Sequence, residues 1–505
     1  MSPSRERYNV LLVMTDQHRA DLMGCAGTTL VPTPHIDRLA ARGVRFTHAY
    51  CPYPVCVASR MSLLTGLYAH TTGAIDNADH LDWRYRTMAH HFAEQGYLTA
   101  LFGKMHFRDG HHHGFAYTLS INDWLMYLGP KVQHYADEIA NAPDSERFFQ
   151  TVHDDGAGFP DVTDLWNGPS PWVGKVERYD FDKMATMTSR LAAEDHLDAF
   201  LAREAAKFLR RYRDQPFFLV VSFMKPHPTF YPPAEWAARY PIEAMKLPEV
   251  SEEEIQQYPP HVQQRIRTFL QVPEWRRRAA IAGYLGNLAF VDTCVGHVVA
   301  ALEELQLAER TIVVYTSDHG HLLGDHGLMG KFCLFEPAVR VPLILSHPPQ
   351  LPQGASTPAL TELLGLYPTV SELAGLPAPC RTRIVESLHT PERVEATSFA
   401  SLARNPTLPG PAAVYSEYHL HGPVCSYMMR THRYKYIHNQ GGVDELYDEE
   451  ADPGEYTNLV HDPRFRVEHE QLRQALFAWF DPAQNRHVAR PSAALAARER
   501  GGRSP

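Results

Sequence analysis

Short, almost continuous apolar segments alternate with longer segments of helical periodicity along most of the chain. The segments rich in β-branched and apolar residues that predict strands are Val10–Thr15, Leu98–Gly103, Phe217–Met224, Thr311–Ser317 and Val341–Ser346. The segments that predict helices are Leu191–Tyr212, Val295–Leu307 and Leu363–Gly375. Strands that are apolar on both faces and separated by helices are typical of a parallel sheet with helices on each side. The sequence therefore predicts an α/β fold.

A proline-rich stretch at 405–411 separates a second, smaller unit from the first. Two strand-like segments, AAVYSEYH and SYMMRTHRYKYIH, follow it, and a terminal helix is predicted around Glu468–Phe480. The final segment, PSAALAARERGGRSP, has a polar composition. We therefore predict three parts, which are a large α/β domain over 1–405, a small α+β domain over 406–490 and a disordered tail over 491–505.

Charge, cysteine content and the length of apolar runs argue against several classes of protein. The formal net charge of −10, without a long basic run, gives no support to nucleic-acid binding. The 7 cysteines show no disulfide framework, which favours a reducing compartment. The apolar runs are short for a membrane span, and the N-terminal one ends at Met14, too early for a secretory signal. These features predict a cytoplasmic protein that binds neither membranes nor nucleic acid.

Polar and charged side chains follow four of the predicted strands at the point where each strand ends. The four segments read TDQHR, GKMH, KPHP and SDHG, and they supply Asp16, Gln17, Lys104, His106, Lys225, His227, Asp318 and His319. In an open α/β sheet, ligands bind outside the carboxyl ends of the strands. We therefore expect these side chains to converge on one site.

Each of these residues also has an ordinary structural interpretation. Asp16 could cap a helix, His227 could be a loop histidine held between two prolines, and Asp318–Gly320 could form a turn. The chain contains 29 histidines, so a single histidine carries little weight. The prediction of a site rests on the joint placement of these residues at four strand ends.

The residue types at the strand ends favour a metal centre. Asp16, Gln17 and Asp318 offer oxygen ligands, which suit Ca²⁺ or Mg²⁺, and the imidazole of His319 also makes the set compatible with Mn²⁺. The triple histidine at 111–113 could bind metal as well, or form a solvated loop. Cationic side chains beside such a metal would create a site for a phosphoryl or sulfuryl group.

The stretch CPYPVCVASRMSLLTG, from Cys51 to Gly66, places two cysteines, a serine and an arginine before a run that can start a helix. The residues alone leave four interpretations open for these cysteines, namely a disulfide, a metal thiolate, an ordinary core thiol and a nucleophile. The cations that would accompany an anion here are Arg60, Lys104 and Lys331.

Several motifs together resemble the type I sulfatases of the alkaline-phosphatase superfamily. In chain order they are VLLVMTDQHR, TPHIDRLAARGVRFTHAY, CVASRMSLLTG, GYLTALFGKMH, FLVVSFMKPHP, TSDHGHLLGDHGLMGK, RYKYIH and LYDEEADPGEYTNL. GAIDNADH and GKMHF are similar to choline sulfatases, KPHP with the following YPP to iduronate-type sulfatases, and the Asp-Gln pair also to phosphonate monoester hydrolases. The resemblance implies a large mixed, mostly parallel sheet sandwiched by helices, with a smaller C-terminal α+β domain.

The resemblance gives Cys56 a role. In this family the cysteine of a Cys-x-Pro-Ser-Arg motif is oxidised to formylglycine (3-oxoalanine) by a maturation enzyme, and its hydrated form is the nucleophile. Cys56 has Ser59 and Arg60 in the matching register, whereas Cys51 does not fit. Ala58 stands where the family usually has proline, so we expect the converted fraction to depend on the expression host.

The resemblance also implies roles for the strand-end residues. The metal, with Ca²⁺ favoured over Mn²⁺ and Mg²⁺, would be held by Asp16, Gln17, Cys56, Asp318 and His319. Arg60 and Lys104 would stabilise the charged nucleophile, and His106 would act as the base. His227 would protonate the leaving oxygen. The sulfate group would be bound by His227, Lys331 and Asn77.

The predicted function is hydrolysis of a small organic or carbohydrate sulfate ester with release of inorganic sulfate. One alternative is a phosphonate monoester or phosphate diester hydrolase that uses the same site. The other is a non-catalytic anion-binding homologue, if Cys56 is not converted. Aromatic residues in His111–Tyr179 could stack on the alcohol part of the substrate or simply pack in the protein; they include Trp124, Tyr127, Trp166 and Trp172. A homo-oligomer is left open.

Overall fold

The computed structural model describes residues 7–107, 110–129, 188–189, 191–228, 230–380, 393–419 and 425–485. A nine-stranded sheet lies at its centre, with the strand order β11–β2–β10–β6–β1–β5–β3–β4 and β9 paired to β2. The strands are β1 (Asn9–Asp16), β2 (Val44–Tyr50), β3 (Leu98–Gly103), β4 (Tyr117–Leu119), β5 (Phe217–Pro226), β6 (Thr311–Ser317), β9 (Arg340–Val341), β10 (Leu343–Ser346) and β11 (Ala355–Glu362).

The sheet is mostly parallel, as the sequence predicts. β6, β1, β5, β3 and β4 run parallel to one another, and β11 runs parallel to β2. The predicted strand Val341–Ser346 is divided at Pro342 into β9 and β10, and both parts pair antiparallel to their neighbours. This reversal is what makes the sheet mixed.

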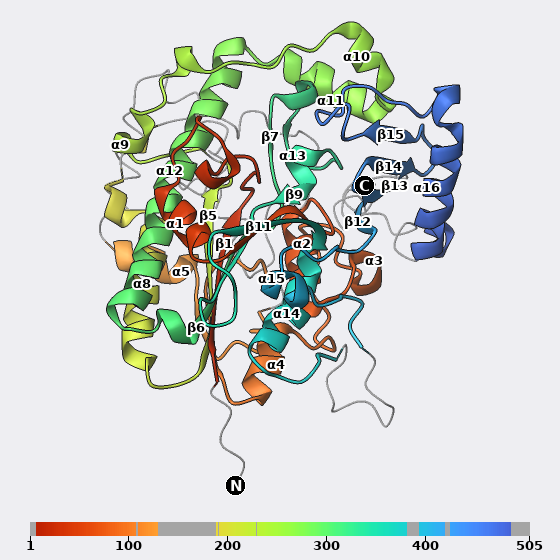
Figure 1. Ribbon diagram of the computed structural model, residues 1–505. Coiled ribbons are helices and arrows are strands. Elements are labelled where there is room, and N and C mark those ends of the chain that lie inside the picture. Colours follow the sequence, from red (N-terminus) through yellow and green to blue (C-terminus); the bar gives the residue numbers. More distant parts are fainter. Residues whose placement is uncertain are drawn as a thin grey trace, which may run out of the picture.

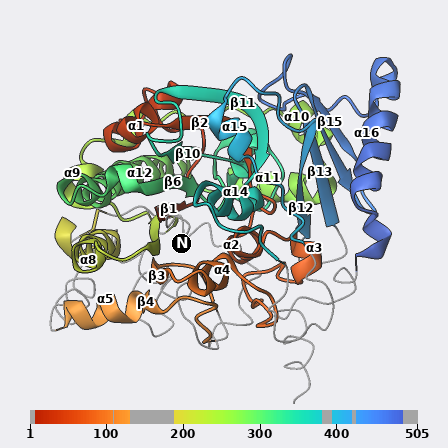
Figure 2. The same cartoon turned by 60° about the horizontal axis from the view of Figure 1, so that its bottom comes forward.

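Two hydrophobic cores cover the two faces of the sheet. The side chains of β1 alternate between them, because successive residues of a strand point to opposite faces. Val10 and Met14 belong to one core, and Leu11 and Val13 to the other. Figures 1 and 2 show the helices that complete these two layers. The first core packs on α2 (Cys56–Thr65), α4 (Met88–Glu94) and α14 (Leu366–Leu373), and the second on α1 (Pro34–Ala41), α8 (Leu197–Tyr212) and α12 (Glu274–Glu304).

Helix α12 begins at Glu274, well before the Val295 start predicted from the sequence. Its middle is apolar on every side, so the amphipathic periodicity that marks a surface helix appears only near its end. By length and composition α12 could cross a membrane, contrary to the expectation that no apolar stretch is long enough, but 83% of its apolar window is buried inside the protein. That burial is typical of a core helix.

A second sheet with antiparallel pairing follows in the C-terminal part of the chain. Its strands are β12 (Ala413–His419), β13 (Cys425–Thr431), β14 (Tyr434–Asn439) and β15 (Glu445–Asp448), and α16 (Arg466–Trp479) packs on it. One face of this sheet joins the large core through Met428 and Ile437, and the other forms a small core of its own around Tyr427 and Leu476. The boundaries at 405 and 490 stay predictions, and the tail 491–505 lies outside the described residues.

Candidate active site

The carboxyl ends of four adjacent parallel strands, β6, β1, β5 and β3, meet at one edge of the large sheet. Asp16 is the last residue of β1, Lys104 directly follows β3, His227 follows β5 and Asp318 follows β6. All four side chains are buried. The strand-end argument from the sequence therefore predicts where these residues lie.

Helix α2 brings Cys56 to the same edge. The helix begins at Cys56 and ends at Thr65, and Gly66, with φ of 68°, closes it by donating its backbone N–H to Ser62 O. The N-terminus of a helix favours negative charge, because its first backbone N–H groups have no partner inside the helix. Cys56 thus lies where an anionic nucleophile or a bound anion would be stabilised.

Four predicted site residues surround the sulfur of Cys56. Lys331 Nζ lies 2.6 Å from Sγ and His319 Nε2 lies 3.3 Å from it. Asp16 Oδ1 and Lys104 Nζ are each 3.7 Å away. Cys56 is fully buried, so these groups form its immediate electrostatic environment.

Arg60 joins the two central carboxylates. Its guanidinium donates to Asp16 Oδ2 at 2.9 Å and to Asp318 Oδ2 at 2.8 Å. The same side chain donates to Ser222 Oγ at 2.8 Å and to the backbone carbonyl of Lys104. Ser222 lies inside β5, within the motif FLVVSFMKPHP but away from its strand end, so the strand-end rule does not predict its contact with Arg60. Arg60 is 0% exposed, so its buried charge depends on these neighbours for compensation.

The charge states of Asp16 and His319 follow from this environment. Burial alone would raise the pKa of Asp16, but the positive charges of Lys104, His227 and the other nearby cations outweigh it and hold that pKa well below its usual range. Burial lowers the pKa of His319 to about 4. Asp16 is therefore ionised and His319 neutral at pH 7, which are the forms that bind metals.

The donor set suits a hard divalent cation. Ligand atoms of Asp16, Cys56, Asp318 and His319 all lie within 4.8 Å of one another. The positive Lys331 Nζ already sits among such donors, 3.1 Å from His319 Nε2 and 3.3 Å from the side-chain oxygen of Gln17. The triple histidine 111–113 belongs to neither of the two metal-ligand groups found among the described residues.

Two site residues have backbone conformations that amino acids other than glycine rarely adopt. Gln17 has φ of 66° and His106 has φ of 70°. Such left-handed residues cost about 1–3 kcal/mol and cluster at functional sites. His106 is buried at 4% exposure just beyond the end of β3, in the segment that also carries Lys104.

A close approach of two strands at Gly103 sets the position of Lys104. Gly103 has φ of 97°, and a Cβ there would lie 2.1 Å from the Ser222 carbonyl oxygen. We expect Gly103→Ala to lower the free energy of unfolding by roughly 3 kcal/mol or more. Gly27 is the matched control, because it has the same φ but no atom within 4 Å of the added Cβ. Urea unfolding of both variants tests this, and equal losses would show that the contact with Ser222 does not matter.

The segment that carries His227 is held in place by hydrogen bonds to Asp198 and Asn287. Asp198, at the start of α8, accepts hydrogen bonds from the backbone N–H groups of Met224 and Lys225 at 2.7 and 3.2 Å. The Lys225 ammonium donates to Asn287 Oδ1 and to the Tyr231 carbonyl, both at 2.9 Å. Burial lowers the pKa of Lys225 to about 8. Lys225 therefore has a structural role in the segment, next to His227.

The remaining predicted residues lie further from Cys56 or outside the described part. Asn77 Oδ1 accepts from the backbone N–H of Val57, in the first turn of α2, at 3.3 Å. Trp124 is buried and donates to the Asp195 carbonyl at 2.7 Å, as expected of an aromatic residue that packs in the protein. Trp166 and Trp172 lie outside the described residues.

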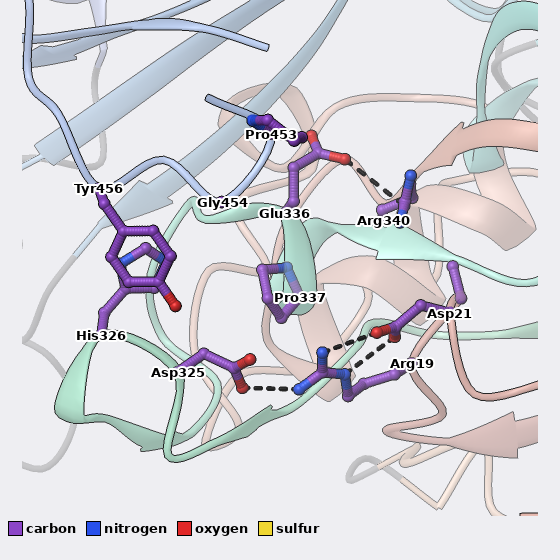
Figure 3. A pocket seen from close by; sticks show the side chains of 11 residues that line it. Arg19, Asp21, Asp325, His326, Glu336, Pro337, Arg340, Pro453, Gly454 and Tyr456 are labelled. Atoms are coloured by element: carbon purple, nitrogen blue, oxygen red, sulfur yellow. Dashed lines mark hydrogen bonds and ion pairs between the residues drawn. The ribbon is translucent and has the colours of Figure 1, made fainter. Parts of the chain in front are cut away.

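A separate pocket of about 170 Å³ is lined by residues that include Arg19, Asp325 and Glu336. Figure 3 shows that charged side chains line it and pair with one another. Arg19 binds Asp21 at 2.8 Å and Asp325 at 2.6 Å, and Arg340 Nε lies 3.5 Å from Glu336 Oε2. None of the predicted site residues lines this pocket.

The second metal-ligand group has a cation of its own. It consists of Glu336, Glu449 and Glu455. Lys435 Nζ lies 2.9 Å from Glu336, 3.7 Å from Glu449 and 2.5 Å from Glu455. This buried group of ion pairs ties the C-terminal sheet to the segment around Glu336.

Comparison with known proteins gives sulfatase-type family models that together span residues 8–480. The Sulfatase family model matches residues 8–376, and the model of the N-sulphoglucosamine sulphohydrolase C-terminal region matches residues 324–480. A sulfatase of Formosa agariphila is 30% identical over 498 residues, with 93% of this chain and 86% of the relative covered. A choline-sulfatase of Rhizobium meliloti is 28% identical and covers 92% of this chain and 84% of its own, and an iduronate 2-sulfatase of Mus musculus is 31% identical with coverages of 75% and 71%.

A solved structure supports the fold independently. The phosphonate monoester hydrolase of Agrobacterium radiobacter superposes with a TM-score of 0.76 at 23% identity, covering 95% of this chain and 96% of that one. The match of the Sulfatase model over residues 8–376, together with a relative 30% identical over 93% of the chain, shows that the chain belongs to the sulfatase family of sulfuric ester hydrolases.

Proposed function

We propose that this sulfatase releases inorganic sulfate from a small organic or carbohydrate sulfate ester, using Cys56 converted to formylglycine and one divalent metal. The observation that carries the proposal is the surroundings of Cys56. A cation, an imidazole and a carboxylate lie within 3.7 Å of its sulfur at the N-terminus of α2. A buried thiol with those neighbours is in place to become a nucleophile that attacks an anionic ester.

The metal site would use this chain's own oxygen and nitrogen donors. Asp16, Gln17, Asp318 and His319 would hold the ion, and the converted residue 56 would complete the set. When bound, the metal would polarise a sulfate oxygen and favour the ionised nucleophile. Ca²⁺ is the favoured ion because three of the four side chains offer oxygen, and Mn²⁺ is the alternative because of the imidazole.

Hydrated formylglycine at position 56 would supply one hydroxyl to attack sulfur. Deprotonation of its second hydroxyl would then break the bond between carbon and the sulfate oxygen, which would release sulfate and restore the aldehyde. Lys104 and Lys331, both buried, would stabilise the negative charge of the sulfuryl group and orient it toward residue 56. Arg60 would hold the two carboxylates in place through its hydrogen bonds to Asp16 and Asp318. His106 would accept the proton whose removal releases sulfate.

His227 would protonate the leaving oxygen. Its Nδ1 is hydrogen-bonded to the Pro228 carbonyl, so Nε2 is the nitrogen that would give up the proton. Release of an alkoxide from an alkyl or sugar ester requires such an acid, whereas a phenolate with an electron-withdrawing group leaves without one.

His227→Ala is therefore expected to slow alkyl and sugar sulfates by about 10²–10⁴-fold and 4-nitrophenyl sulfate by roughly tenfold or less. The comparison of kcat/KM for the two ester classes in the same preparation provides its own control for folding and conversion. Equal losses on both classes would contradict the role of His227 as the acid.

The alcohol part of the substrate is proposed by class only. Relatives named choline-sulfatase and iduronate 2-sulfatase support a small cationic alcohol or a saccharide. Rates on choline sulfate, sulfated sugars and aryl sulfates would separate these classes. The same screen with phosphonate monoesters and phosphate diesters tests the alternative function, which a higher kcat/KM on phosphonates than on any sulfate would favour. We further propose that the enzyme acts in the cytoplasm, in accordance with its free cysteines.

A further inference from the structure

The backbone of Gln17 is held on both sides in its left-handed conformation. Its N–H donates to Asp318 Oδ1 at 3.1 Å. Its carbonyl accepts from the Tyr284 hydroxyl at 2.7 Å, and the same hydroxyl accepts from the Arg19 N–H at 3.1 Å. Tyr284 lies within the buried part of α12, fully enclosed. A strained backbone persists only where its surroundings hold it, and here Asp318 and Tyr284 do so.

The carboxamide of Gln17 has one favoured orientation. Its Nε2 lies 2.6 Å from Nδ1 of His321, and its Oε1 lies 3.3 Å from Lys331 Nζ. An ammonium group can only donate hydrogen bonds, so it selects the oxygen of the carboxamide on its side. The NH₂ group must then face His321, and Nδ1 accepts from it in the tautomer that carries its proton on Nε2. Turning the carboxamide over would place its NH₂ against the ammonium.

His321 is itself held in place by aromatic neighbours and by a backbone hydrogen bond. It is 0% exposed, and its ring stacks on Tyr284 with centroids 5.1 Å apart and an interplanar angle of 10°. Phe230 packs on it edge to face at 5.8 Å. Its backbone N–H donates to the Pro337 carbonyl at 2.7 Å. His321 belongs to neither metal-ligand group of the described residues.

We infer that His321 is a positioning residue that, together with Tyr284, turns the oxygen of Gln17 toward the metal and its nitrogen away from it. The inference rests on the proposed metal site. It explains how the amide of Gln17, in which only the oxygen is a good ligand for a hard cation, can act as a metal ligand. Without the acceptor at Nδ1, the buried NH₂ group would lose its hydrogen-bond partner, and the orientation that presents the oxygen to a cation would be less favoured.

The test uses three variants of the full-length protein after removal of metal with a chelator. His321→Phe keeps a flat ring that can stack on Tyr284 but removes the acceptor, whereas His321→Asn restores an acceptor near the position of Nδ1. Tyr284→Phe keeps the stacked ring but removes the hydroxyl that holds the Gln17 carbonyl. Binding of Mn²⁺ and of Ca²⁺ alone is measured by calorimetry, and the melting temperature of each metal-free variant is measured in parallel.

We expect His321→Phe to weaken metal affinity by about 10–100-fold, the usual effect of losing a residue that orients a ligand, and His321→Asn to remain within about threefold of the parent. Tyr284→Phe should weaken metal affinity in the same direction, which keeps the test decisive if His321→Phe fails to fold. Unchanged metal affinity in the two phenylalanine variants, or a loss in His321→Asn equal to that in His321→Phe, would overturn this inference but leave the proposed metal site standing. A parent protein that binds neither ion would overturn the proposed metal site as well.

Discussion

Cys56→Ala is expected to reduce turnover of sulfate esters by roughly 10⁴–10⁶-fold, the range seen when a covalent nucleophile is removed. The reason is that Cys56 is the side chain toward which Lys331, His319, Asp16 and Lys104 converge. Removing it leaves the cationic surroundings but no atom that can attack sulfur. Steady-state kinetics with a substrate of the parent enzyme measure this loss.

The matched control is Cys51, the other buried cysteine of the same stretch. Its sulfur lies 3.9 Å from the Ala338 carbonyl oxygen, and none of the proposed chemistry uses it. Cys51→Ala should therefore keep kcat within about threefold of the parent, with a modest loss of stability of about 1 kcal/mol from the small cavity. Comparable losses of turnover in both variants would point to folding rather than chemistry.

Asp318→Ala is expected to abolish metal binding and to lower kcat/KM by at least about 10³-fold. Asp318 is both a proposed ligand and the partner of Arg60 Nε, so its removal withdraws a carboxylate from the metal and leaves a buried guanidinium with one anion fewer. Elemental analysis of the purified variant and of the parent, alongside kinetics with added Ca²⁺, Mn²⁺ or Mg²⁺, gives both readouts.

Asp292 provides a buried carboxylate outside the site for comparison. It accepts hydrogen bonds from the backbone N–H groups of His35 and Ile36 at the start of α1, and Asn at that position keeps an acceptor. Asp292→Asn should retain the parent's metal content and activity. Retention of stoichiometric metal in Asp318→Ala would contradict the proposed coordination.

The central strands can be predicted from the sequence because they are buried on both faces and read as unbroken apolar runs. β1, β3, β5 and β6 are of this kind, and their predicted bounds differ from the observed ones by two residues or fewer. In β2, with the sequence VRFTHAY, buried apolar residues are interrupted by partly exposed polar ones. β11 contains Pro358. Neither of these strands has the unbroken apolar sequence that predicts a buried parallel strand. Both lie at the β11 end of the sheet, away from the four central strands.

The site was predictable to the extent that its residues follow strand ends or a motif. Asp16 and Asp318 come directly at the ends of apolar runs, so the topology rule for α/β sheets brings them together. Ser222 and His321 lie within the motifs FLVVSFMKPHP and TSDHGHLLGDHGLMGK, but neither residue stands directly at a strand end, and Tyr284 lies inside a buried helix and in no motif. The contacts of Ser222 with Arg60 and of Tyr284 with Gln17 join segments far apart in the chain.

The chemical state of Cys56 decides the proposed mechanism most directly. Trypsin releases residues 46–60, a peptide that ends at Arg60 and contains both Cys51 and Cys56. Conversion of Cys56 to formylglycine lowers the mass of this peptide by about 18 Da and leaves one thiol for alkylation instead of two. Mass spectrometry with fragmentation should place the change at residue 56 in active preparations. Because Ala58 replaces the usual proline, the converted fraction should vary with the expression host, and turnover should rise in proportion to it. A fully active preparation in which Cys56 is entirely thiol would contradict the mechanism.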